Sequence, residues 1–493
     1  MARVSEAAVE PLPRSLVRVI VVVILGTFMV QMDGTMVGVA LNTLRDEFSV
    51  DVPTIQWVTT GYLLSMTMVI PVTGWAVDRF GARRMWMLAL IVFGLASLAC
   101  AVSWSAPALI VARIVQGLGA GMLLPLGQAL LAQAAGPDKL GRVMGAVGLP
   151  AMLGIVLGPV AGGAIVTGLS WRWMFLINLP ICGAALIASA RYMPRGQNAS
   201  AKLARLDVLG LCLLSPALAG IVYGLARAGS LGGFYQAEVL VPLIAGAALL
   251  AGFVVHATTT SVEPLIDLRL LRAPSFSAAS AVMFLFGVAM FGIALVVPLY
   301  LQEARGWSAL HAGLLALPQG IGMAIALIVG GRLTDRIGPR WIVLVGVALT
   351  VVGLGMLTQV DDRTSQPFLL LAGFIAGIGL GATTVPATTA SYRDVNRAAI
   401  PRATSAVRIF QQLGGSLGAA ILAVVLQTQI TSAIASSGGA PTPEAIAAAF
   451  AHTFGWALVL AAVAFFPALL LPATPATRPD NRDASAEKSE AHA

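Results

Sequence analysis

The chain of 493 residues consists largely of long apolar segments separated by short polar connections. Each segment is about 20 residues long or longer, the length that an α-helix needs to cross the hydrocarbon core of a bilayer. The pattern therefore predicts an all-α integral membrane protein with fourteen spans. These spans are 16–41, 54–77, 85–104, 107–133, 143–167, 173–192, 206–227, 238–256, 275–301, 309–333, 341–359, 367–390, 403–427 and 451–472.

Basic residues in the connections predict the orientation. With an even number of spans both termini share one side, and 24 of the 30 Lys and Arg residues fall on that side. The other side carries Arg45, Arg172, Arg227, Arg305 and Arg363, and Arg113 lies within a span. Because cytoplasmic loops are enriched in Lys and Arg, both termini are predicted to be cytoplasmic. The first apolar run continues without a cleavage site and is interpreted as an uncleaved first span.

A loop sequence occurs twice, after the second span and after the tenth, at an offset of 257 residues (331 against 74). Both copies read G-x-x-x-D-R-x-G-x-R. The first contains Gly74, Asp78, Arg79, Gly81 and Arg83, and the second contains Gly331, Asp335, Arg336 and Gly338. Glycine permits a sharp turn, and charged residues at helix ends can form breakable contacts. The two copies favour a gating role over the alternative of a topology signal with a turn.

The repeat also predicts the domain organisation, because duplicated halves around a central site are typical of alternating-access carriers. Residues 16–193 and 274–472 form two six-helix bundles, and residues 206–258 form two inserted helices. Residues 1–15 form a cytoplasmic N-terminus and 473–493 a disordered cytoplasmic tail.

Composition narrows the function. Apolar residues make up 58% of the chain and charged residues 11%, against about 25% charged in soluble domains. The net charge of +8 is spread over short loops, which argues against nucleic-acid binding. Three cysteines within apolar runs offer neither a disulfide framework nor a metal site. No nucleotide-binding G-x-x-x-x-G-K-[ST] sequence occurs. We therefore predict a transporter driven by an ion gradient, which is not an enzyme and needs no cofactor or metal.

Asp33 and Arg113 are charged residues deep within predicted spans, where ionisable groups are expensive and usually functional. From the helical rise, Asp33 lies about 8 Å and Arg113 about 9 Å from the outer surface. The two can therefore meet. We predict that Asp33 is a proton-coupling carboxylate assisted by Arg113. The alternative is an ion pair that only supports packing.

Two further groups are candidates for movement and for substrate binding. The fifth span contains a glycine-rich stretch, whose spacing suits close helix packing and a bend that seals one side of the membrane. It comprises Gly154, Gly158, Pro159, Gly162 and Gly163. Soft and aromatic side chains suit bulky amphipathic ligands, although lipid-facing or core packing is the alternative. The predicted cavity residues are Met29, Met32, Met36, Gln116, Phe284, Met290 and Phe291.

These motifs resemble the major facilitator superfamily and, within it, the fourteen-span drug:proton antiporter-2 family. The repeated loop matches the superfamily signature. Residues 113–120 are similar to the R-x-x-Q-G-x-G-A sequence assigned to proton coupling, and 154–163 to the G-x-x-x-G-P-x-x-G-G sequence of antiporters. Residues 33–41 and 171–180 also resemble family segments, but Asn42 stands where the family usually has Pro.

The resemblance implies a proton-coupled antiporter that exports drugs or other amphipathic toxic compounds by alternating access. Its expected partners are a small substrate, protons and the lipid bilayer of a bacterial cell membrane, and it is expected to be monomeric. A single cavity carboxylate predicts tolerance of neutral or monocationic compounds. Two alternatives stay open: a dedicated exporter of one endogenous metabolite, such as a self-made antibiotic or a lipid, and a transporter-like sensor.

Overall fold

The computed structural model describes residues 13–135, 140–193, 206–260, 264–307, 309–395, 399–437 and 442–474. Over these ranges the regular structure is helical, which confirms the all-α prediction. Thirteen of the described helices are long and apolar enough to cross a membrane. The remaining predicted span, the fifth, coincides with helix α5 (Leu140–Gly168). The predicted tail beyond residue 474 and the first twelve residues lie outside the described ranges.

The first bundle, α1 to α7, starts from a helix longer than predicted. Its helices are α1 (Arg14–Phe48), α2 (Val52–Phe80), α3 (Ala82–Ala101), α4 (Ala106–Ala135), α5, α6 (Trp173–Leu176) and α7 (Asn178–Tyr192). Asp51 caps α2 by accepting a hydrogen bond from the backbone N–H of Thr54 at 3.2 Å. Gly81, with φ at 85°, makes the turn from α2 to α3 that a residue with a Cβ would strain.

The second bundle comprises α10 to α17. Its helices are α10 (Pro274–Leu299) with a following π-helical turn (Tyr300–Ala304), α11 (Ala309–Leu315), α12 (Leu317–Ile337), α13 (Pro339–Leu357), α14 (Gln366–Ser391), α15 (Ile400–Ser437), α16 (Pro443–Ala462) and α17 (Phe465–Leu469). The predicted tenth span is divided at Ala316, because Pro318 fits the first turn of a new helix but not a helix interior.

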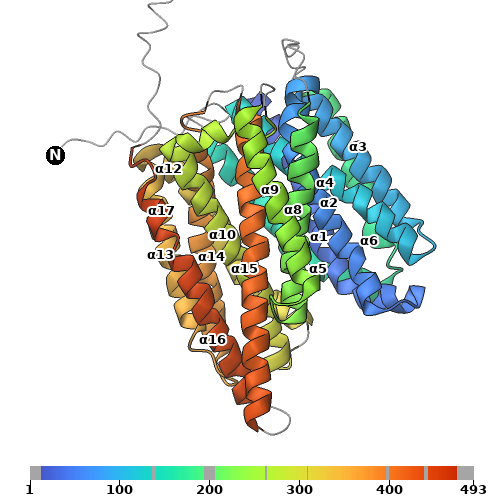
Figure 1. Cartoon of the computed structure of the whole chain (residues 1–493), viewed down its shortest axis with the longest axis vertical. Coiled ribbons are helices and arrows are strands. Elements are labelled where there is room, and N and C mark those ends of the chain that lie inside the picture. The colour runs from blue at the N-terminus through green and yellow to red at the C-terminus, as the bar shows by residue number, and fades with distance from the viewer. Residues whose placement is uncertain are drawn as a thin grey trace, which may run out of the picture.

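Helix packing repeats between the two bundles. Helix α1 packs on α5 as α10 packs on α15, and α2 packs on α4 as α12 packs on α14. The contact of α3 with α4 likewise has its counterpart in α13 with α14. Figure 1 shows the first bundle in blue and cyan beside the second in yellow to red. This correspondence is the one expected of two copies of one six-helix unit.

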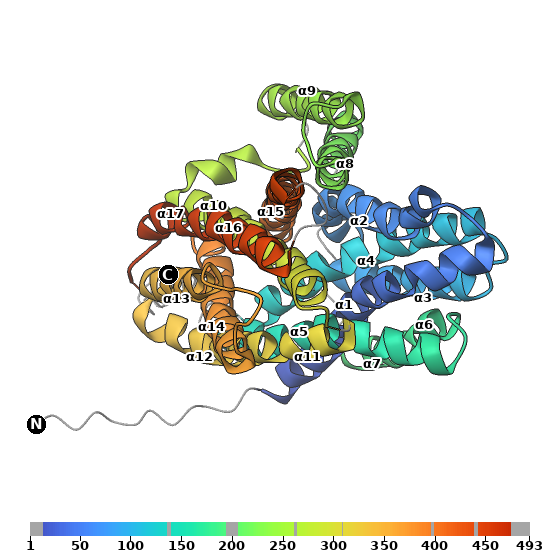
Figure 2. The ribbon, with the colours of Figure 1, turned by 90° about the horizontal axis from the view of Figure 1, so that it is seen from below.

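The inserted helices α8 (Val208–Leu231) and α9 (Ala237–Thr259) lie on one side of the seam between the bundles. Helix α8 contacts α2, where the Ser215 hydroxyl donates to the Met68 carbonyl at 2.7 Å. It also contacts α15, where Gly229 lies against Ala423. Helix α9 packs on α8 and is the outermost helix in the view of Figure 2. Together these contacts let α8 bridge both bundles.

The bundles are joined directly at the end of the molecule where α1 begins, α2 ends and α15 begins, which we call the terminal face. Arg402 of α15 donates through Nε to Asp78 Oδ2 of α2 at 2.9 Å. Gly74, one turn earlier on α2, lies so close that a Cβ there would be 3.2 Å from the Arg402 Cα. The second seam pairs α5 with α12, where Gly148 lies against Leu327.

Candidate functional site

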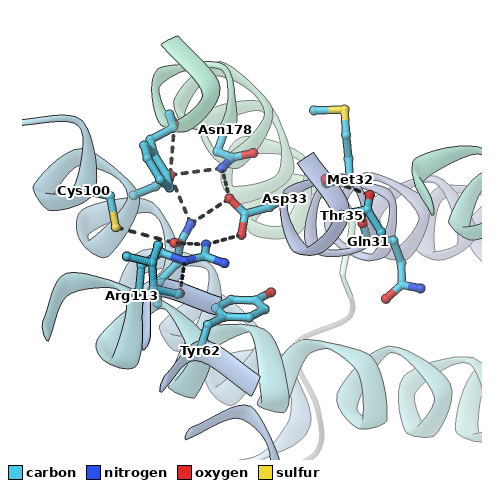
Figure 3. Close-up of polar contacts among 12 residues, drawn as sticks. Gln31, Met32, Asp33, Thr35, Tyr62, Cys100, Arg113 and Asn178 are labelled. Carbon is cyan, nitrogen blue, oxygen red and sulfur yellow. Dashed lines mark hydrogen bonds and ion pairs between the residues drawn. The ribbon is translucent and has the colours of Figure 1, made fainter. Parts of the chain in front are cut away.

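Asp33 and Arg113 meet inside the first bundle. Helix α1 carries Asp33 and α4 carries Arg113, and Arg113 Nη1 lies 2.7 Å from Asp33 Oδ2 (Figure 3). Both side chains are closed off from solvent, with exposures of 0% for Arg113 and 1% for Asp33. An ion pair of this kind in a low-dielectric interior is stable only when its remaining polar atoms are hydrogen-bonded.

Neutral donors complete the coordination of the carboxylate. Asp33 Oδ1 accepts from Asn178 Nδ2 at 2.8 Å and from Gln116 Nε2 at 3.1 Å. Both amides also donate to the Ser97 hydroxyl, which in turn donates to the Phe175 carbonyl at 2.9 Å. Four helices, α1, α3, α4 and α7, thus contribute side chains to one network around a single carboxylate.

The guanidinium of Arg113 is held on three sides. Its Nε donates to the Val58 carbonyl at 3.2 Å, and its Nη1 also donates to Gln116 Oε1 at 2.7 Å. Its Cζ lies 4.0 Å from the ring centroid of Tyr62, a cation–π contact. Beside the pair, Arg113 Nη2, Tyr62 Oη and Asn178 Oδ1 are buried without a hydrogen-bond partner among the described residues. Buried polar atoms without a partner are uncommon, and these three lie together in or beside the ion-pair network.

Sequence reasoning located the centre of this network but not all of its members. Gln116 was predicted to line the substrate cavity, whereas the structure places it, fully buried, between Asp33 and Arg113. Asn178 falls within the family-like segment 171–180, and no role is predicted for it from the sequence. Its signal was an amide at the start of an otherwise apolar span, where a polar group needs a partner.

The glycine-rich stretch of α5 packs against α1, the helix that holds Asp33. A Cβ at Gly154 would lie 2.7 Å from the Phe28 carbonyl oxygen, and one at Gly158 would lie 2.8 Å from that of Met32. Gly162 is equally close to Met36, whereas Gly163 has space, with 4.0 Å to Val39. Pro159 is half-buried beside them. Three of the four predicted glycines therefore set the distance between α1 and α5.

The predicted cavity residues form two separate groups. Met29, Met32 and Met36 are buried in the first bundle, and Cys182 Sγ lies 3.3 Å from Met29 Sδ. In the second bundle the Phe284 backbone and the Phe291 ring lie against glycines of α15. Met290, which precedes Phe291 in the chain, is half-buried. Phe291 keeps 40% of its surface exposed. Their role in binding substrate stays a prediction.

The two predicted gating loops differ in their contacts. In the first loop Asp78 bonds to Arg402, Arg79 is exposed and Arg83 donates to the Ala190 carbonyl at 2.7 Å. Sequence reasoning did not identify Arg402 as the partner, since no local pattern links positions 324 residues apart.

The second loop is covered by the end of the described chain. Gly338, with φ at 85°, lies against the Ala473 carbonyl, and the Arg340 backbone N–H donates to the Pro472 carbonyl at 3.3 Å. Arg393 Nη1 donates to the Thr474 carbonyl at 2.9 Å. Gly331 is buried and Arg336 exposed, while the side chain of Asp335 lies outside the described residues.

Fold and site together define a polytopic membrane protein of two related helix bundles with a buried ion-pair network in the first. The sequence profile of the Major Facilitator Superfamily matches residues 23–419, and a second match, to residues 279–492, begins 256 residues after the first (279 against 23). The chain belongs to this superfamily of membrane transporters.

Named relatives and solved structures agree with this assignment. The chain is 39% identical over 416 residues to a multidrug resistance protein B homolog of Mycobacterium tuberculosis, covering 84% of this chain and 77% of the relative. It is 30% identical over 459 residues to the lincomycin resistance protein LmrB of Bacillus subtilis, covering 92% and 95%.

Among solved structures, the human organic anion transporter MFSD10 superposes with a TM-score of 0.65 at 18% identity, over 92% of this chain and 100% of that one. The proton:xylose symporter XylE superposes with a TM-score of 0.62 at 14% identity, over 95% and 98%. These structures establish the shared fold.

Proposed function

We propose that this transporter is a proton-coupled antiporter that exports drugs or other amphipathic toxic compounds from the cytoplasm by alternating access. The names of its relatives, a multidrug resistance protein B homolog and a lincomycin resistance protein, support drug export. The buried Asp33–Arg113 pair supports proton coupling. Asp33 supplies a carboxylate at membrane depth that can bind a proton, and its partner Arg113 stays charged.

The coupling step follows from the charges of the pair. A proton that binds Asp33 neutralises its carboxylate, and the guanidinium of Arg113 then loses its counter-ion inside a low-dielectric bundle. The network of α1, α3, α4 and α7 must then rearrange, and α1 transmits the change to α5 through the glycine contacts at Gly154 and Gly158. Deprotonation restores the ion pair, so the two protonation states favour different packings of these helices.

The movement proposed for this cycle is a rocking of two bundles, 16–193 and 274–472, about the seams α2–α15 and α5–α12. The Asp78–Arg402 contact joins the two bundles at the terminal face in the present conformation and must break when that face opens. The excess of basic residues on that face supports its assignment to the cytoplasm of a bacterial cell, with both termini inside. Each chain contains both bundles and is proposed to work as a monomer.

The test replaces the carboxylate. Asp33→Asn keeps the size of the side chain but cannot exchange a proton, so we expect efflux driven by a pH gradient to fall at least about tenfold. The measurement is drug transport in everted vesicles with and without the gradient, at matched protein level. Asp46→Asn, an exposed change on the same helix, is the control and should transport normally. Gradient-driven efflux by Asp33→Asn at the wild-type rate would disprove the proposed coupling.

A further inference from the structure

The second bundle contains a charged residue at membrane depth that the proposed coupling does not use. Arg408 lies in the span Ile400–Ala435, eight residues after the start of α15 and therefore about 12 Å from the terminal face. It is about 9 Å deeper than Arg402, which forms the contact with Asp78 at that face. Ionisable residues at this depth are usually functional, because burying a charge is unfavourable.

The contacts of Arg408 leave its charge unbalanced. Arg408 Nη1 donates to Gln411 Oε1 at 2.5 Å, one turn deeper into the membrane, so the side chain does not extend back to the terminal face. No described acidic side chain forms an ion pair with it. Its Nε and Nη2 form no hydrogen bond in the described structure, and the residue is half-buried.

The first bundle offers the opposite arrangement. There Arg113 is balanced by Asp33, whose carboxylate is sealed from solvent and already accepts from three residues. Asp33 in this conformation therefore has no free position for a cationic ligand. At the repeat offset of 257 residues, Met290 stands where the first bundle has Asp33, so the second bundle lacks the matching carboxylate.

The surroundings of Arg408 add an apolar surface. Gly414 and Gly415, about two turns further along α15, lie against the Phe284 backbone and the Phe291 ring of α10. Phe284 is half-buried and Phe291 remains 40% exposed. Residues Phe284 and Phe291 of α10 therefore lie alongside the turns of α15 that follow Arg408. A guanidinium with unpaired N–H groups and an apolar surface further along the same helix suit a ligand with an anionic head and an apolar body.

We propose that Arg408, oriented by Gln411, binds the anionic head group of an amphipathic substrate, a carboxylate or a phosphate. The inference rests on the proposed export function and names its substrate class. A planar guanidinium can donate two parallel N–H groups to such an anion, and the anion supplies the charge that Arg408 lacks within the protein. The expected tolerance of neutral or monocationic compounds rested on a carboxylate in the cavity, whereas an anion site at Arg408 predicts a preference for anionic compounds.

The experiment uses three dansyl amphiphiles with one common apolar tail that end in a carboxylate, a carboxamide or a tertiary amine. Their dissociation constants for the purified transporter in a maltoside detergent are measured by fluorescence anisotropy. We expect the wild type to bind the carboxylate about tenfold more tightly than the carboxamide. Arg408→Gln should remove this preference and Arg408→Lys should keep part of it. Arg269→Gln, a change at an 82% exposed arginine, should leave it intact.

The proposal is overturned if the wild type binds carboxylate and carboxamide equally, or if Arg408→Gln keeps the preference. Should Arg408→Gln prove unstable, Arg408→Lys is measured alone. Equal affinities of Arg408→Lys for the carboxylate and amine probes would then overturn the proposal too. Phosphatidylglycerol and phosphatidylcholine are added in separate arms. Displacement of the carboxylate probe by phosphatidylglycerol alone identifies a lipid head group as the anion, and no displacement identifies a soluble compound; both support an anion site.

A separate measurement keeps the two proposals apart. Transport of the carboxylate probe by the wild type in proteoliposomes, with and without a pH gradient, tests export itself. Preferential binding without transport would contradict the proposed function and leave the anion site in place. Gradient-driven transport of all three probes at equal rates, with equal affinities, would contradict the anion site alone.

Discussion

The hydrogen-bond and ring contacts around Asp33 show which neighbouring residues support its ion pair with Arg113. Asn178 donates to Asp33 Oδ1 and to Ser97, so it links α7 to the ion pair on α1 and α4. Tyr62 contributes differently, since its ring faces the guanidinium of Arg113 at 4.0 Å while its hydroxyl has no described partner. This ring contact does not depend on the charge of Asp33, and neither do the hydrogen bonds from Arg113 to the Val58 carbonyl and to Gln116. Each residue leads to a prediction.

Removing the Asn178 donor should weaken the network without abolishing the fold. In Asn178→Ala the Asp33 carboxylate loses one hydrogen bond, worth about 1.5–3 kcal/mol for a charged acceptor. We expect proton-driven efflux to fall about tenfold or more, with a lower melting temperature in detergent. Asn178→Gln can restore the donor, and a wild-type rate in Asn178→Ala would show that the amide has no part in coupling.

Removing the Tyr62 ring should destabilise the protein more than removing its hydroxyl. A desolvated cation–π contact is worth about 2 kcal/mol, and Tyr62→Leu loses it while Tyr62→Phe keeps a ring face of similar shape. Thermal unfolding in detergent and gradient-driven efflux are the measurements. The expected order is wild type close to Tyr62→Phe and well above Tyr62→Leu. Equal losses in both variants would instead assign the effect to the hydroxyl.

At the scale of elements, the contact between α1 and α5 depends on glycine at particular positions. Helix α5 approaches the backbone of α1 at Gly154, Gly158 and Gly162, where an added Cβ would lie 2.7 to 2.8 Å from a carbonyl oxygen of α1. Gly163 belongs to the same sequence motif, but a Cβ there would make only an ordinary contact with Val39 at 4.0 Å. Helix packing therefore requires glycine at three positions of this motif but not at Gly163.

This difference supplies a matched pair of substitutions. Gly158→Ala forces α5 away from Met32 and should destabilise the protein by about 1–3 kcal/mol, the usual range for overpacking. We expect reduced efflux and a lower melting temperature. Gly163→Ala adds the same methyl group where the nearest atom, of Val39, is 4.0 Å away, and should behave like the wild type. Similar effects of the two changes would argue against this packing role.

Across the whole molecule, the bundles are held at the terminal face by a contact between α2 and α15. Asp78 and Arg402 are partly exposed, at 22% and 16%, and form this contact over both Nε and Nη2. The second copy of the loop has a different partner, the chain's own segment Pro472–Thr474. Two loops of one sequence therefore have different tertiary roles in this conformation.

Breaking the Asp78–Arg402 contact should shift the population towards a terminal face that is open. Asp78→Asn removes about 1 kcal/mol of ion-pair energy at this exposure, which changes a two-state ratio about fivefold. The distance between spin labels at Arg84→Cys and Arg336→Cys, both exposed positions, reports the opening. Cys212→Ser removes the exposed native thiol. An unchanged distance distribution would contradict a gating role.

The sequence by itself determined the class of fold, because every membrane span needs about 20 apolar residues and satisfies its backbone hydrogen bonds internally. It also determined that Asp33 and Arg113 lie at one depth, since the helical rise fixes depth along a span. The duplicated loop gave the repeat, which recurs in the packing of both bundles.

Tertiary structure alone decided which side chains meet. Depth along a span does not give the rotation of a helix or its neighbours, so the partners Asn178 and Gln116, and Arg402 opposite Asp78, were not predictable from spacing. For the same reason, the lack of a counter-ion at Arg408 was not predictable from the sequence. Sequence indicates a cation in a span, but only the packing of α15 shows that no carboxylate balances it among the described residues.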